Sequence, residues 1–156
     1  MRNKLLGLLL CLPPVVLVVL ASATAAAVDG VAAGEKTTIA LRQQNRSGQS
    51  GTATLIEQAD GTFTVKIRMS KPVRLPGPRQ NAHIHNVTCA KYARMKSFNA
   101  QLATVVDWLS NLSRGRSTTH VSVALAKRTT GRYAINIHEQ NPSYTVVACG
   151  NIPRAS

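Results

Sequence analysis

Short segments in which polar and apolar residues alternate restrict this chain to a β-sheet fold. The clearest covers residues 62–70, where every second position is apolar: Phe63, Val65, Ile67 and Met69. Alternate residues of a strand point to the same face of a sheet, so this segment predicts a strand with one buried side.

Turn signals separate this segment from similar ones. Residues 51–57 alternate as well, and Asp60-Gly61 lies between the two segments, so together they predict a β-hairpin. Residues 71–81 hold three prolines and a glycine and predict a loop. Further strands are predicted at residues 37–42, 82–87, 117–125, 132–138 and 144–152. Short strands of this kind indicate an all-β antiparallel sandwich or barrel.

The segment from residue 90 to residue 116 fits two predictions. Its apolar residues recur at helical spacing: Leu102, Val105, Val106, Leu109 and Leu112. This spacing predicts a short helix with Asn99 as a candidate cap. The alternative is a long loop that packs these residues over one end of the sandwich.

The first 27 residues have the pattern of a secretory signal. Arg2 and Lys4 precede an apolar stretch at residues 5–20, and small residues follow it. The Pro13-Pro14 pair argues against a membrane anchor, which needs about 20 unbroken apolar residues. We therefore expect a signal peptide at residues 1–27, export to the extracellular space or periplasm, and no membrane span in the mature protein.

The remainder is the size of one domain. Residues 28–36 are small and polar and predict a flexible lead-in, and residues 37–156 predict a single β-sandwich domain. Removal of the signal takes away Cys11 and leaves Cys89 and Cys149. An even pair in an exported protein indicates an intrachain disulfide, and a loop of about 60 residues gives it about 4 kcal/mol of stabilisation. The alternative is two unpaired cysteines.

The chain is strongly basic. It has 19 Lys plus Arg and 6 Asp plus Glu, and without Arg2 and Lys4 the balance is 17 to 6, a net charge of +11. Such a surface attracts anions, among them superoxide. The charges are scattered and aromatic residues are few, so we expect no specific nucleic-acid partner.

Three histidines are placed where strands can bring them together. His83 and His85 lie two apart and share one face of the predicted strand, and His138 shares a face with Asn136 on a later strand. Three imidazoles from two strands would suit copper or zinc. The alternative is that each is a surface or hydrogen-bonded imidazole.

The motifs that hold these residues resemble the copper/zinc superoxide dismutase family. They are Ala82-His83-Ile84-His85 with Cys89, then Ile137-His138, then Ala148-Cys149-Gly150-Asn151-Ile152. The resemblance covers residues 51–152 and implies an eight-stranded Greek-key β-barrel. It implies His83, His85 and His138 as copper ligands, a Cys89–Cys149 disulfide, and dismutation of superoxide to oxygen and hydrogen peroxide.

The chain departs from that family in two places. The family's zinc ligands and its bridging histidine lie between the first cysteine and a later strand, where residues 90–119 hold no histidine and only Asp107 as an acid. We therefore expect no zinc site. Val146 stands where the family has an arginine that guides the anion. By alternation His120 faces solvent and does not replace the bridging ligand.

Two functions are compatible with these features. One is a secreted, superoxide dismutase-like copper protein, in which the missing bridging histidine leaves open whether the activity survives. The other is a non-catalytic extracellular binding or structural module, because the His-Ile-His motif is also similar to CHRD-type domains.

Overall fold

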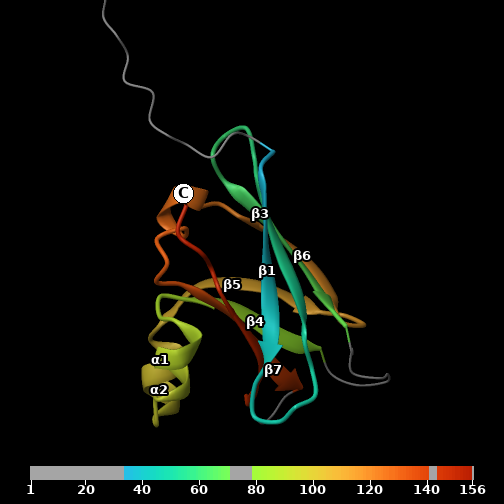
Figure 1. Ribbon diagram of the computed structural model, residues 1–156, viewed down its shortest axis with the longest axis vertical. Helices are drawn as coiled ribbons and strands as arrows, with labels where there is room; N and C mark the ends of the chain where they lie inside the picture. The colour runs from blue at the N-terminus through green and yellow to red at the C-terminus, as the bar shows by residue number, and fades with distance from the viewer. Residues whose placement is uncertain (1–33, 71–78, 141–143, 156) are drawn as a thin grey trace, which may run out of the picture.

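The computed structural model describes residues 34–70, 79–140 and 144–155. These residues form eight β-strands and three short helices (Figure 1). The strands are β1 (Lys36–Gln43), β2 (Gly51–Glu57), β3 (Phe63–Met69), β4 (Gln80–His85), β5 (Val105–Leu112), β6 (Arg116–Val121), β7 (Ala134–Gln140) and β8 (Val146–Asn151). The helices are α1 (Cys89–Ala93), α2 (Phe98–Leu102) and the 3-10 turn η1 (Leu125–Lys127). The predicted signal peptide at residues 1–27 lies outside the described residues, as does most of the lead-in, whose last residue, Lys36, begins β1.

The strands form an antiparallel barrel. Their order is β5-β4-β7-β8-β1-β2-β3-β6, and the hairpin that joins β5 to β6 brings the two ends of this order together. Its turn is Arg114-Gly115, and both residues have positive φ angles (51° and 71°), as a tight hairpin turn requires. Strands β4, β5 and β6 follow one another, and β7 returns to lie beside β4, which is a Greek key. The all-β Greek-key fold implied by the family resemblance is confirmed.

The apolar core lies inside this barrel. The predicted hairpin is present as β2 and β3, and the alternating side chains of β3 point inward. The core residues are Ile39, Leu41, Ala53, Leu55, Phe63, Val65, Ile67, Met69, Ala82, Ile84, Leu109, Leu112, Val121, Leu125, Ile135, Ile137, Val147, Ala148 and Ile152. Burial of this set is the main contribution to the stability of the barrel.

The helix predicted from the spacing of Leu102 to Leu112 is wrong, and so is the alternative of a long loop. Most of that segment is strand β5, and the chain forms α2 before it, capped by Ser97 rather than Asn99. A β-bulge explains why the apolar residues of this strand recur at helical spacing. Gln80 pairs with Leu112 and Ala82 pairs with Leu109, so β5 has one extra residue between these two pairs. Leu109 and Leu112 therefore both enter the core although they are three apart.

Several predicted boundaries also differ from those of the structure. Strand β4 begins at Gln80, so the last two residues of the predicted 71–81 loop belong to a strand; residues 71–78 lie outside the described part. Strand β6 ends at Val121, and the chain then turns into η1 instead of continuing to residue 125. Leu125 is nevertheless buried, as its place in the pattern predicts.

A disulfide fastens the helical segment to the barrel. Cys89 at the start of α1 is bonded to Cys149 on β8, which confirms the predicted pair. Around it lies a second apolar cluster, outside the main core: Val87, Tyr92, Ala134, Val146 and Cys149. Figure 1 shows α1 and α2 together on one side of the barrel. Within the described ranges, no helix is both long enough and apolar enough to cross a membrane.

Candidate metal centre

Strand β4 turns two histidines away from the core. Ala82 and Ile84 point into the barrel, so the residues that alternate with them, His83 and His85, lie on its outer face. Both are nevertheless buried, with exposed fractions of 4% and 1%. Burial on an outer face means that other parts of the chain cover these imidazoles.

Strand pairing brings the third histidine to them. On β7, Asn136 is the direct cross-strand partner of His83, and His138 lies two residues further on the same face. A residue two positions from the direct partner is a diagonal neighbour, within reach of an aromatic ring. The ring centroids of His83 and His138 are 5.0 Å apart.

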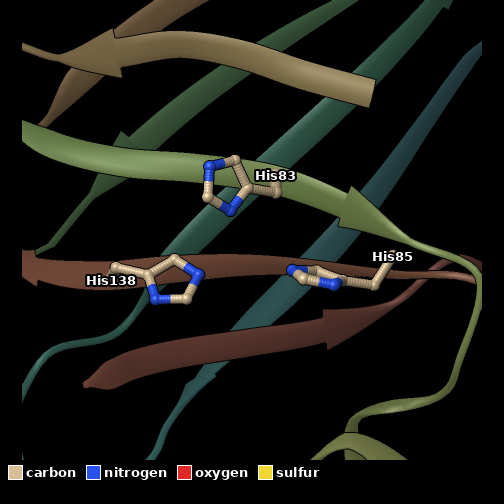
Figure 2. Close-up of side chains that lie close together, drawn as sticks. All are labelled: His83, His85 and His138. Carbon is tan, nitrogen blue, oxygen red and sulfur yellow. The ribbon is translucent and has the colours of Figure 1, made fainter. Parts of the chain in front are cut away.

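The three rings surround a common space. One ring nitrogen from each of His83, His85 and His138 lies within 4.8 Å of the other two. Figure 2 shows the rings turned toward one another from β4 and β7. The predicted convergence of these imidazoles is therefore present in the structure, and all three are buried.

A hydrogen bond determines which nitrogen His85 presents. Its Nδ1 lies 2.9 Å from Thr104 Oγ1, and this hydroxyl donates to the backbone carbonyl of Gln101 at 2.7 Å. Because the only proton of the hydroxyl is used there, Thr104 accepts a hydrogen from His85 Nδ1. The Nε2 atom of His85 then carries the lone pair, and it is buried without a hydrogen-bond partner.

His138 is oriented in the same way. Its Nδ1 lies 2.7 Å from the backbone oxygen of Tyr144, which can only accept a hydrogen bond. The lone pair is therefore on Nε2, again buried and without a partner. Tyr144 has a φ angle of 50°, which is a strained conformation for a residue with a side chain.

His83 is held by an aromatic contact. Its ring packs edge-on against the indole of Trp108 on β5, with centroids 4.2 Å apart. Trp108 is the cross-strand partner of His83 and is 65% exposed. The Nδ1 atom of His83 is the third buried ring nitrogen without a partner.

The surroundings keep these imidazoles neutral. Burial, with a smaller effect of nearby His138, lowers the pKa of His83 from 6.5 to about 4. Burial also lowers the pKa of His85 to about 3, with His83 as the next cause. The pKa of His138 is lowered by burial, and its bond to Tyr144 opposes this only in part. At neutral pH the lone pairs are therefore free to bind a cation.

The donor set of these three rings fits a metal ion. A buried ring nitrogen without a hydrogen-bond partner is costly, and a cation bound by all three rings would relieve that cost. Nitrogen ligands bind zinc at about 2.0–2.1 Å, which places two such ligands at most about 4.2 Å apart. Ring movements of less than about 1 Å would close the present arrangement on a single ion.

Other candidate residues are not part of this group. His120 is exposed on β6, as predicted, and pairs with Thr64 on β3. Val146, which the sequence resemblance aligned with an arginine of superoxide dismutases, belongs to the apolar cluster around the disulfide. Asp107 forms an ion pair with Arg128 (Oδ2–Nε 2.6 Å).

Comparisons with known proteins give a distant likeness in fold. No family model matches the chain, and no curated protein sequence matches it. The solved structure of a point mutant of superoxide dismutase 5 from Candida albicans is similar to it, with 17% sequence identity and a TM-score of 0.49. The alignment covers 78% of this chain and 92% of that one. Inferences about what this chain binds therefore rest on the chemistry of its own side chains.

Proposed function

We propose that this protein binds one copper ion through His83, His85 and His138. The observation that carries the proposal is the set of three buried nitrogens, one on each ring, that have no hydrogen-bond partner. Imidazole ligands suit copper and zinc, and for a given set of nitrogen ligands divalent copper binds more tightly than zinc. Copper is therefore the metal we assign.

The residues around the three histidines would favour Cu(I) over Cu(II). The three ligands are neutral, and among the described residues no carboxylate joins the group. Placing a dication in a buried site without a compensating negative charge costs more than placing a monocation there. We therefore expect the site to stabilise Cu(I) relative to Cu(II).

We further propose that the protein works outside the cytoplasm. The Cys89–Cys149 disulfide supports this, because disulfides persist in oxidising compartments. The basic start and the apolar stretch of residues 1–27 support export from the cytoplasm as well.

We propose superoxide as the substrate of the copper-loaded protein. Bound copper would supply the one-electron redox cycle that dismutation requires. The protein would contribute three ligands that leave a coordination position open, and, without residues 1–27, a net charge of +11 that attracts an anion. Within the described ranges no fourth histidine joins the three, so we expect slow dismutation.

Copper loading followed by a superoxide assay tests the proposal. The oxidised protein is equilibrated with copper in the presence of a competing chelator, and the bound metal is counted for wild type, His138→Ala and the matched control His120→Ala. We expect one copper in wild type and His120→Ala, and loss of binding in His138→Ala. No stoichiometric binding in any of the three would contradict copper binding and favour the CHRD-like, non-catalytic module. Superoxide consumption by the loaded protein then separates an enzyme from a copper carrier.

A further inference from the structure

The strands β1, β2, β3 and β6 pair side by side, and their outward side chains lie in rows across the sheet. Figure 1 shows β1, β3 and β6 together, apart from α1 and α2. The metal centre lies on β4 and β7, in the other half of the barrel. We define the outer face by the residues that alternate with the buried ones on these four strands: Lys36, Thr38, Ala40, Thr52, Thr54, Ile56, Thr64, Lys66, Arg68, Arg116, Thr118 and His120.

The register places like charges directly opposite each other on this face. Arg68 on β3 is the cross-strand partner of Arg116 on β6, and Lys66 lies two residues from Arg68 along β3. All three side chains are exposed. Directly opposite residues have Cβ atoms about 4.5–5.5 Å apart, and like charges at that separation destabilise a sheet. An anion bound between the two guanidinium groups would replace this repulsion with attraction.

No acidic side chain offsets these cations. None of the residues of the outer face is acidic, and among the described residues neither arginine forms an ion pair. Glu57 and Asp60 lie at the β2–β3 turn, and Glu57 pairs with Phe63 at the other end of β3. Five residues of strand separate Phe63 from Arg68, about 17 Å, which exceeds the Debye length of about 8 Å at physiological ionic strength.

A fourth cation lies at the same end of the sheet. Arg114 is exposed in the turn between β5 and β6, and the carbonyl of the next residue, Gly115, accepts a hydrogen bond from the backbone of Met69 at 2.8 Å. This bond places the turn beside the end of β3. The outer face therefore ends in a concentration of positive charge that favours an anion with several charged groups.

Threonine hydroxyls cover much of the remaining outer face. Their side chains come from all four strands, and Oγ1 of Thr38 lies 3.4 Å from Oγ1 of Thr54. A hydroxyl both donates and accepts hydrogen bonds, as the hydroxyls of a sugar do. The threonines are Thr38, Thr52, Thr54, Thr64 and Thr118.

The composition of the outer face distinguishes between classes of polyanion. It contains no Phe, Tyr or Trp, on which the bases of a nucleic acid would stack. Its apolar members are Ala40 and Ile56, too few to enter the acyl boundary of a membrane. Cations beside hydroxyls on a flat sheet suit a polymer that carries both acidic groups and many hydroxyls.

We propose that the outer face binds an acidic polysaccharide. Arg68 and Arg116 would hold one sulfate or carboxylate group between them, because the guanidinium fork matches the geometry of such groups. Lys66 and Arg114 would pair with neighbouring acidic groups, and the threonines would bond to sugar hydroxyls. The surface is independent of copper and would retain the protein on an acidic polymer outside the cytoplasm.

Titration of fluorescently labelled heparin and polygalacturonate with the metal-free protein tests this inference. The first polymer carries sulfate as well as carboxylate groups and the second only carboxylates, so the two arms identify the preferred acid. We expect saturable binding of at least one, no binding of neutral dextran, and weakening by salt. Tighter binding of single-stranded DNA or of phosphatidylserine vesicles than of both polysaccharides would overturn the proposal, as would no saturable binding of either polysaccharide.

Two double variants of equal net charge locate the contact. Arg68→Gln/Arg116→Gln should weaken binding of the preferred polysaccharide about 10- to 30-fold at low salt. Lys91→Gln/Arg94→Gln, at exposed cations in and just after α1, should change it less than about twofold. The first variant removes a like-charge pair, so its free energy of unfolding should equal or exceed that of wild type. Equal weakening in both variants would show that net charge alone attracts the polymer and would contradict a defined surface.

Discussion

Thr104 holds His85 in place by accepting the hydrogen on Nδ1, across a distance of 2.9 Å. The two residues belong to different parts of the fold: His85 ends β4, and Thr104 follows α2. The helical segment between them therefore selects which nitrogen faces the other two rings. An outer partner of this kind commonly determines the orientation and basicity of a histidine ligand.

Thr104→Val should weaken copper binding without preventing folding. Valine keeps the shape of threonine but cannot accept the His85 hydrogen, so the ring is free to rotate. We expect copper affinity to fall about 10- to 100-fold, and the free energy of unfolding to fall by about 1 kcal/mol. Competition with a chelator measures the affinity, and Thr118→Val, at an exposed position of β6, is the matched control. An unchanged affinity in Thr104→Val would show that this hydrogen bond does not position the ligand.

The metal-free protein should lose stability as the pH falls below 6.5. The folded state lowers the pKa of His83 to about 4 and of His85 to about 3, so between these values and 6.5 the unfolded chain binds more protons than the folded chain. The free energy of unfolding is then greatest above pH 6.5 and declines through this window. Urea unfolding at several pH values measures the slope. His83→Gln should flatten it, and a slope identical to wild type would contradict the shifted pKa.

Removal of the disulfide should destabilise the barrel markedly. The bond joins residues 60 positions apart, and closing a loop of that length contributes about 4 kcal/mol in the chain-entropy model. Guanidinium unfolding of the Cys89→Ala/Cys149→Ala double variant, beside oxidised wild type, measures the difference. A loss below about 1 kcal/mol would mean that the loop remains ordered without the bond.

Trp108 should report metal binding. It is the only tryptophan in the chain, and its ring contacts that of His83. Copper held by His83 would therefore quench its fluorescence, and the quenching should saturate at one equivalent. His138→Ala should abolish the saturable phase, and His120→Ala should retain it. Saturable quenching that is the same in both variants would place copper elsewhere.

The sequence predicted most of the strands and the convergence of His83, His85 and His138. Alternation in β3 and the Asp60-Gly61 turn are local signals, and burial of one face follows from them directly. His83 and His85 share a face by the same rule. That His138 joins them depends on the β4–β7 register, which the family resemblance implied and local pattern alone did not supply.

Features that arise from tertiary contacts were missed. The bulge between β4 and β5 gave Leu109 and Leu112 a helical spacing inside a strand, so periodicity predicted the wrong element. Thr104 and Trp108 are distant in sequence from the histidines they contact, and nothing local marks them.

Electron paramagnetic resonance of the Cu(II)-loaded protein tests the central claim most directly. Hyperfine splitting from ligand nitrogens counts the imidazoles bound to the ion. We predict a signal from three equatorial nitrogens in wild type and in His120→Ala, and loss of that signal in His83→Ala. An identical signal in wild type and His83→Ala would show that copper does not bind at the His83, His85 and His138 group.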